Sequence, residues 1–270
     1  MLSLHNTRLQ LEKFIYKQGI NAALYYAEQS DEYKSFKKDL VKALMAQINY
    51  VADYKEHLPL LMSLAKASSD PLSSQIETLL SKVTLANGVD LQAYLVWAGT
   101  QGGQAALDKL ELQGIFGLKN QALIDYFGQY SNLLIDTLDD TTKKFIAKVI
   151  QDGKDQGLTP FEIQQLLVRD GTVESQIRAE RIVLTETAKA MTTIEKNAAS
   201  RYGIQTLIWR TSLDDRVDPI CLDLEGKESS ISKSFPGGYD GPPAHVSCRC
   251  YLEEVIPTDW VVPSKIWLGE

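Results

Sequence analysis

The sequence predicts an α+β protein: a mostly α-helical N-terminal two-thirds, followed by a small, loop-rich C-terminal module that contains β-strands. Two observations support this prediction. Apolar residues recur at helical spacing through most of the first 200 residues, in long stretches with few helix-breaking residues. Beyond residue 203, β-branched and aromatic residues are interrupted by clusters of Gly, Pro and Asp, which is typical of short strands and tight turns.

The composition favours a globular chain with a real core. Its 270 residues are 44% hydrophobic and 23% charged, which is ordinary for a soluble protein. No stretch approaches the roughly 20 apolar residues of a membrane span, and the first five residues begin no secretory leader. We therefore expect no membrane partner.

The charge balance argues against a protein held on nucleic acid. The net charge is −7, and residues 200–270 carry 7 Lys and Arg against 11 Asp and Glu. Neither part of the chain has the basic excess that neutralises phosphates. Direct DNA binding would need a local basic patch that the sequence gives no reason to expect.

Several helices can be placed in the first half of the chain. Residues 4–66 are dominated by amphipathic helical patterns, and Asp70-Pro71 marks the start of a helix that we expect to end at Asn87-Gly88. The glycines between residues 99 and 117 predict turns, or a hinge between two helical subdomains.

Three further helices follow. We expect the first over residues 120–151, and the second to begin at Thr159-Pro160 and extend to Val168, with Glu162 completing an N-terminal cap. The third spans residues 172–200. Its apolar face is formed by Ile177, Leu184, Ala188, Met191 and Ala198.

The C-terminal module begins where Tyr202-Gly203 ends the last of these helices. Residues 206–211 have the composition of a strand, and Asp218-Pro219 is predicted to form a turn. Residues 249–256 are predicted to form a final strand. The tail beyond it, with Trp260 and Trp267 among polar neighbours, is expected to need a partner to become ordered.

All three cysteines and one histidine gather in this module. Three thiolates and one imidazole, from Cys221, His245, Cys248 and Cys250, are the ligand set of a closed structural zinc site. The Cys-x-Cys spacing is tighter than is usual for such sites. The alternative is that the cysteines are small buried hydrophobic residues and that His245 hydrogen-bonds a backbone carbonyl.

An ordered set of motifs extends from the helix over residues 172–200 to the end of the module. The residues that carry it are Arg181, Thr185, Glu186, Gly203, Trp209, Asp214, Asp215, Arg216, Cys221, Leu224, Gly226, Pro242, Pro243, His245, Cys248, Arg249 and Cys250. Together they resemble the phage minor head protein family (phage head morphogenesis, Mu F-like). The resemblance covers roughly residues 155–256, and the chain departs from the family pattern at Leu184, Asp218 and Val246.

The resemblance implies a minor head (capsid) protein of a tailed bacteriophage. Such a protein acts in head morphogenesis with the portal and with capsid or scaffold components, and it influences DNA packaging or ejection. Its place is the virion, at the capsid interior or portal vertex, after assembly in the host cytoplasm. By position, residues 1–153 would dock on the portal or head, residues 154–257 would form the head-morphogenesis domain, and residues 258–270 would be a tail.

Two further expectations concern single residues. The alternative function is a nuclease-like enzyme or DNA-contacting module that uses His245, Asp214 and Glu186, although no complete catalytic motif is present and we predict that the protein is not an enzyme. We also expect Arg181 and Glu186 to tie their helix to the module through a charge-assisted bond. Glu195 is expected to be exposed on the same helix.

Overall fold

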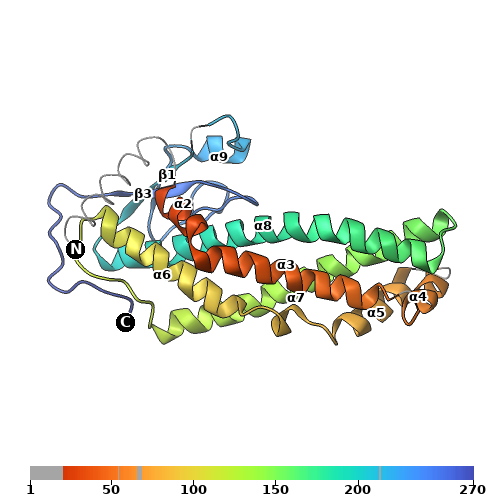
Figure 1. Ribbon diagram of the computed structural model, residues 1–270. Coiled ribbons are helices and arrows are strands. Elements are labelled where there is room, and N and C mark those ends of the chain that lie inside the picture. Colours follow the sequence, from red (N-terminus) through yellow and green to blue (C-terminus); the bar gives the residue numbers. More distant parts are fainter. Residues whose placement is uncertain (1–20, 54, 66–68, 213) are drawn as a thin grey trace. The chain divides into compact units, whose positions relative to one another are not determined.

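The computed structural model describes residues 21–53, 55–65, 69–212 and 214–270 (Figure 1). Its helices before the sheet are α2 (Ala22–Gln29), α3 (Asp31–Val51), α4 (Leu58–Leu64), α5 (Ser69–Leu80), the 3-10 helix η1 (Leu85–Asn87), α6 (Leu91–Lys109), α7 (Gln121–Asp155) and α8 (Pro160–Arg201). They are followed by β1 (Thr206–Arg210), α9 (Pro219–Leu224), β2 (Glu228–Ser230) and β3 (Tyr251–Val255). The predicted α+β class is confirmed. Among the described residues, no helix is long and apolar enough to cross a membrane.

The chain divides into two compact units that are each assembled from separate segments. The first unit takes its described residues from the segment ending at Lys34, from residues 92–127 and from residues 181–270, and the second consists of residues 35–91 and 128–180. The domain boundaries expected after residues 153 and 257 stay predictions.

The second unit has an aliphatic core. Its buried members come from α3, α4, α5, α7 and α8 and include Ile48, Leu58, Leu61, Ile76, Ile146, Ile150, Ile163 and Leu167. One charge is buried beside this core: Arg178 donates to Thr142 Oγ1 and to the carbonyl oxygen of Leu138, each at 3.1 Å. The two acceptors replace the water that the guanidinium loses, so that the charge can stay inside.

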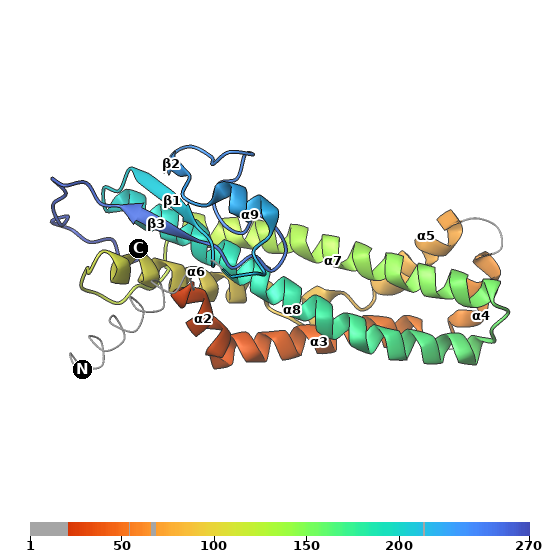
Figure 2. The same cartoon turned by 90° about the horizontal axis from the view of Figure 1, so that it is seen from above.

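The first unit combines the sheet with α2, α6 and the C-terminal part of α8. The sheet is antiparallel in the order β2-β1-β3, which places β1 in the middle (Figure 2). Thr206 pairs with Ser230 on one side and with Val255 on the other. A small cluster of Leu24 and Ala27 from α2 with Ala188 and Met191 from α8 buries part of the apolar face predicted for the latter helix. The prediction is wrong at Ile177, which is 42% exposed.

The expectation of turns or a hinge across residues 99–117 is wrong over most of that segment, because α6 runs through Gly99, Gly102 and Gly103 without a break. These glycines serve close packing instead. A Cβ atom at Gly102 would lie 2.1 Å from the carbonyl oxygen of Met191 on α8, and one at Gly103 would lie 2.3 Å from the ring of Phe116. The missing side chains let other parts of the unit come within reach of the α6 backbone.

Local sequence signals predict some helix ends correctly and others wrongly. Glu162 Oε2 accepts from the Thr159 amide at 2.8 Å and Thr159 Oγ1 accepts from the Glu162 amide at 3.3 Å, so the predicted cap is confirmed. The expected break between residues 168 and 172 is wrong, since α8 is continuous through Gly171. The helix expected to end at Asn87-Gly88 ends at Leu80 instead, and the η1 turn follows.

The C-terminal tail docks on its own chain, which corrects the expectation that it needs a partner. Trp260 Nε1 donates to the carbonyl oxygen of Tyr202 at 2.8 Å, and the Tyr202 hydroxyl donates to that of Trp267 at 2.6 Å. Further along, the carbonyl oxygen of Leu268 accepts from the amide of Gly117 at 3.0 Å.

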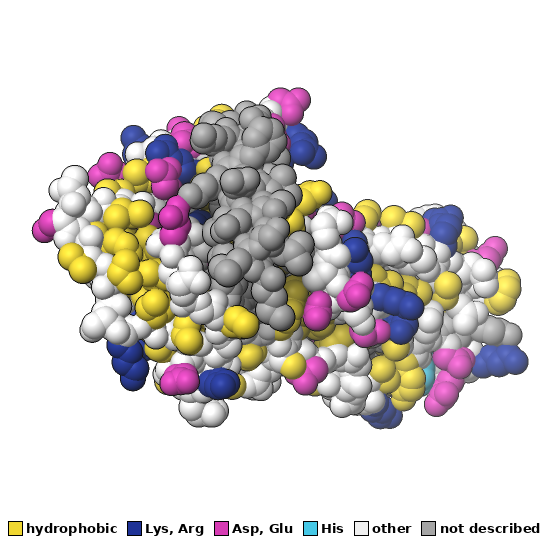
Figure 3. All heavy atoms as spheres, turned by 60° about the vertical axis from the view of Figure 1, so that its left-hand side comes forward, with side chains coloured by type: hydrophobic (Ala, Val, Ile, Leu, Met, Phe, Trp, Pro, Cys, Tyr) yellow, Lys and Arg dark blue, Asp and Glu magenta, His cyan; other side chains and the backbone are white. Residues whose placement is uncertain are grey.

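Surface charges are mixed. On the face drawn in Figure 3, the coloured Lys and Arg side chains lie among Asp and Glu side chains and do not gather into one patch. This agrees with the charge balance of the sequence, which did not favour DNA binding.

Candidate functional site

The frame of the site is the central strand β1, held in place by a buried tryptophan. Trp209 is fully buried, and its ring meets those of Phe235 at 5.4 Å and Tyr239 at 6.2 Å between centroids, both edge to face. Edge-to-face contacts of this kind add to the area that the rings bury. The motif tryptophan therefore anchors the loop of residues 235–239 to the sheet.

Cys221 is positioned by the short helix α9. Asp218, predicted to lie in a turn, is instead the N-cap of this helix, and its Oδ1 accepts from the Ile220 amide at 2.9 Å. Pro219 occupies the first helical position. The helix ends at Leu224, and the chain enters β2 after Gly226, whose φ of +70° suits a glycine.

The structure groups three of the four predicted metal ligands, Cys221, His245 and Cys248; Cys250 is not part of that group. One ligand atom each from Cys221, His245 and Cys248 lie within 4.8 Å of one another. The Cys221 and Cys248 Sγ atoms are 3.6 Å apart, and the Cys250 thiol interacts with both. All three cysteines are buried and free of disulfides. His245 is half-buried, and its Nδ1 lies 2.9 Å from the carbonyl oxygen of Val246.

The three thiols differ in acidity because they share hydrogen bonds. The thiols of Cys221 and Cys250 act on Cys248, which also accepts from backbone amides, and these contacts lower the pKa of Cys248. The pKa of Cys221 is raised by the Cys248 thiol and by burial, and the pKa of Cys250 is raised by both neighbouring thiols and by burial. The cluster thus favours a thiolate at Cys248.

An ion pair supports the Cys-x-Cys segment. Arg249, between the two cysteines, donates to both oxygens of Asp214, at 2.6 and 2.7 Å. This bidentate contact holds the pKa of Asp214 well below its ordinary value. The neighbouring motif residues Asp215 and Arg216 are exposed, although the Arg216 amide also donates to Asp214, at 3.1 Å.

Thr185 connects its helix to the C-terminal module, a role that was expected from the sequence for Arg181 and Glu186. Its Oγ1 accepts from the Ser247 amide at 2.9 Å, and Ser247 has a φ of +60°, in the left-handed region that non-glycine residues seldom adopt. Arg181 is exposed, whereas Glu186 is buried. The tie between this helix and the C-terminal module that was expected through Arg181 and Glu186 stays a prediction.

A second anchor comes from the start of α2. Asn21 caps that helix through its Oδ1, which accepts from the Leu24 amide at 3.0 Å. Its Nδ2 donates to the carbonyl oxygen of Cys250 at 3.1 Å. The cysteine segment is therefore bonded to residues far away in the sequence.

Sequence reasoning missed a buried charge cluster under β3. Lys109 Nζ forms an ion pair with Glu195, donates to the carbonyl oxygen of Leu252 at 2.6 Å and lies 3.7 Å from Glu254 Oε2. Glu195 is buried, which corrects its assignment as an exposed position. Burial raises the pKa of Glu254 to about 8.

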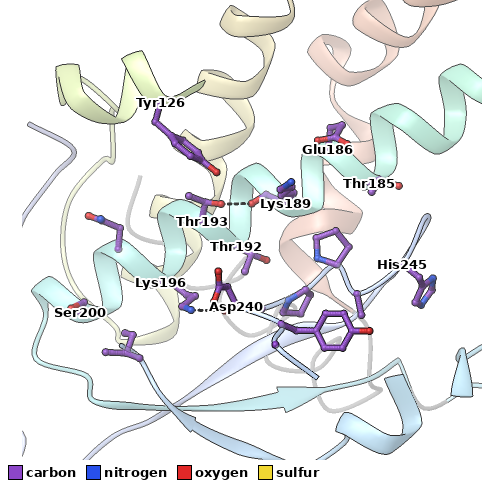
Figure 4. Close-up of a pocket in the computed structure, with 18 residues that line it drawn as sticks. Tyr126, Thr185, Glu186, Lys189, Thr192, Thr193, Lys196, Ser200, Asp240 and His245 are labelled. Carbon is purple, nitrogen blue, oxygen red and sulfur yellow. Dashed lines mark hydrogen bonds between the residues drawn. The ribbon is translucent and has the colours of Figure 1, made fainter. Parts of the chain in front are cut away.

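Beside the sheet lies a groove of about 760 Å³ in the first unit. Figure 4 shows that Glu186, Lys189 and Lys196 line it from α8, while Asp240 and His245 come from the facing loop. Lys196 donates to the carbonyl oxygen of Asp240. Of the residues considered for a nuclease, Glu186 and His245 line this groove, but Asp214 does not and is engaged by Arg249.

Comparison with known proteins bears on the same part of the chain. Residues 144–253 match the model of a family described as Phage Mu protein F like protein. No curated protein and no solved structure matches the chain. The matched segment includes all the motif residues from Arg181 to Cys250. The resemblance carried by those motifs is therefore confirmed: residues 144–253 are similar to the Mu F-like family.

Proposed function

We propose that this protein is a minor head protein of a tailed bacteriophage that acts in head morphogenesis in association with the portal, and that it influences DNA packaging or ejection. The observation that carries the proposal is the match of residues 144–253 to the Phage Mu protein F like family. The proposed partners are the portal protein and capsid or scaffold components. The proposed location is the virion, after assembly in the host cytoplasm.

The architecture supports a structural role rather than an enzymatic one. The motif residues Trp209, Asp214, Thr185 and Arg249 are used to hold the module together, through ring contacts, an ion pair and a hydrogen bond. Residues committed to such contacts are poorly placed to act on a substrate. We therefore assign the motifs to building the module.

The second unit offers apolar side chains for contact with the portal. Leu133 on α7 is 65% exposed and Leu60 on α4 is 49% exposed. A partner that covered these side chains would remove apolar surface from water, which favours association. Both lie within residues 1–153, the part of the chain from which we expect the portal contact.

Co-purification of the full-length chain with the portal protein of the same phage tests the proposal. Leu133→Lys should weaken retention of the chain on tagged portal, because a charge would be buried at the contact. Asn132→Lys is the matched control, since it adds the same charge at the adjacent exposed position of α7.

Two results would count against the proposal. The first is wild-type protein that does not co-purify with the portal and is missing from purified phage heads. The second is equal loss of retention in the Leu133 and Asn132 variants, which would point to non-specific charge effects. Incubation with RNA and DNA is a useful parallel assay, because cleavage would favour the nuclease alternative.

A further inference from the structure

We propose that Cys221, His245, Cys248 and Cys250 bind one Zn²⁺ ion that staples the C-terminal module. The inference is independent of the role in the phage head. It begins from position: the ligands lie on two segments, α9 and the loop before β3, that are separated by 23 residues between Cys221 and His245. A metal ion would join these segments directly.

The spacing of the sulfur atoms fits zinc. Zinc–sulfur bonds are about 2.3 Å long, so two sulfur ligands of a tetrahedral site lie about 3.8 Å apart. The Cys221 and Cys248 Sγ atoms are 3.6 Å apart, and the Cys250 thiol interacts with both. A disulfide between Cys221 and Cys248 would need a distance of about 2.05 Å and would leave the third cysteine unpaired.

His245 has the hydrogen bond expected of a metal ligand. A histidine that binds metal through one ring nitrogen usually donates from the other to a carboxylate or a backbone carbonyl. With the Nδ1 proton directed at the carbonyl oxygen of Val246, 2.9 Å away, Nε2 keeps a free lone pair. From the sequence, a bond from His245 to a backbone carbonyl was an alternative to metal binding. Because that bond uses Nδ1, Nε2 of the same ring is still able to bind a metal ion.

The donor chemistry selects the ion. Three sulfur donors and one imidazole are soft to borderline ligands, which favour zinc over the oxygen-seeking ions Ca²⁺ and Mg²⁺. The grouped ligand atoms among the described residues include no carboxylate oxygen. Zinc also needs no redox partner, so its binding only displaces thiol protons.

Three contacts fix the ligand segments from outside. Thr185 holds the Ser247 amide, Asp214 holds Arg249, and Asn21 holds the carbonyl oxygen of Cys250. Each of these bonds is made by a residue within two positions of His245, Cys248 or Cys250. Outer contacts that orient ligands in this way are part of how metal sites reach high affinity.

The decisive measurement is the metal content of full-length protein purified without chelator and under reducing conditions. We expect about one zinc per chain by mass spectrometry of the metals. Replacement by Co²⁺ should give the strong visible absorption of tetrahedral cobalt with sulfur ligands. Native protein should resist a thiol reagent until a chelator is added.

Variants test the individual ligands. His245→Ala should lower zinc affinity by about 100-fold or more, because even outer partners of metal ligands are worth about 10–100-fold. Val246→Ala is its matched control: the neighbouring side chain is 61% exposed and should leave the affinity unchanged. Cys250→Ser should lower zinc affinity at least as much as His245→Ala does. The thiol that it removes is buried.

Three outcomes would overturn the proposal. One is wild-type protein that stays free of metal after addition of Zn²⁺ and melts at the same temperature with and without chelator. Another is a native Cys221–Cys248 disulfide found by mass spectrometry in metal-free protein. The third is a His245→Ala variant that binds zinc as tightly as the wild type, since this would exclude the imidazole ligand.

Discussion

Glu254 shows how one residue can make stability depend on pH. Its side chain is 4% exposed and faces Lys109 from α6 and Glu195 from α8. Burial raises its pKa from 4.5 to about 8, so the folded chain holds this proton more tightly than the unfolded chain does. The resulting stability is present below pH 4.5 and is lost as the pH rises towards about 8.

We therefore expect Glu254→Gln, which mimics the protonated carboxyl, to flatten the fall in stability between pH 5 and pH 8. The difference in free energy of unfolding between the variant and the wild type should shift in favour of the variant by on the order of 1–2 kcal/mol from pH 5 to pH 8, since one pKa unit is worth about 1.4 kcal/mol. Chemical denaturation across this pH range measures the effect. Glu253→Gln, on the exposed neighbour, should leave the slope unchanged, and parallel curves for Glu254→Gln and wild type would contradict the assignment.

Thr185 provides a second test at this scale. Thr185→Val removes the acceptor of the Ser247 amide and should lower the free energy of unfolding by about 0.5–1.5 kcal/mol, the net value of one hydrogen bond. Thr193→Val is the matched control on α8, because that hydroxyl bonds to the carbonyl oxygen of Lys189 within its own helix. Equal losses in the two variants would show that the contact with Ser247 adds nothing.

The sequence contained signals for the buried carboxylates that its interpretation overlooked. Glu254 is two residues from the buried Leu252, so strand alternation places both on the same face. Glu195 lies four residues after Met191, on the apolar face of α8. What no local pattern could supply is Lys109, because its meeting with these carboxylates depends on how α6, α8 and β3 pack.

At the scale of elements, the glycines of α6 set how closely it meets its neighbours. Gly102→Ala should gain about 1 kcal/mol of helix propensity, yet its Cβ would lie 2.1 Å from the Met191 carbonyl oxygen. Overpacking costs about 1–3 kcal/mol, and backbone cannot move aside like a flexible side chain, so we expect net destabilisation.

Thermal unfolding measures this balance. Gly117→Ala is a suitable control, since a Cβ there would meet nothing within 4 Å, and we expect a change of no more than about 0.5 kcal/mol. A Gly102→Ala variant more stable than the wild type would show that the helices can separate at little cost.

Most elements could be predicted from local signals, and the exceptions have a common cause. The cap at Thr159-Pro160, the strand over residues 206–210 and the final strand were expected where they occur. Asp218-Pro219 has the same cap-and-proline pattern as Thr159-Pro160, but only a six-residue helix follows, too short for periodicity to reveal. The glycines of α6 were wrongly expected to form turns, because helix propensity takes no account of a neighbouring residue that packs into the space where a side chain would be.

At the scale of the whole molecule, the sequence predicted the α+β class and grouped the ligands of the candidate zinc site, because these share one short module. It could not predict that the two compact units would each be assembled from distant segments. It also treated the tail as lacking a partner, since the sequence does not reveal that the carbonyl oxygen and the hydroxyl of Tyr202 bond to Trp260 and Trp267. Nor does it reveal that the amide of Gly117 bonds to Leu268.

The docked tail yields a prediction at this scale. Leu268 is half-buried and lies against Gly114, so Leu268→Ala should lower the free energy of unfolding by about 0.5–3 kcal/mol. Val261→Ala is the control, because that side chain of the same tail is 79% exposed. Denaturant titration of both variants provides the comparison, and an unchanged midpoint for Leu268→Ala would mean that the tail is not part of the fold in solution.

The same docking has a consequence for how the protein is made. The amides of Gly117 and Lys119 find their acceptors in Leu268 and Gly269, which a ribosome adds about 150 residues later. Until then these amides must bond to water, and the segment between α6 and α7 lacks its cover. The first unit can therefore close only after translation has passed Gly269. A nonsense mutation a few codons before Gly269 would leave the amides of Gly117 and Lys119, made in the first half of translation, without these acceptors.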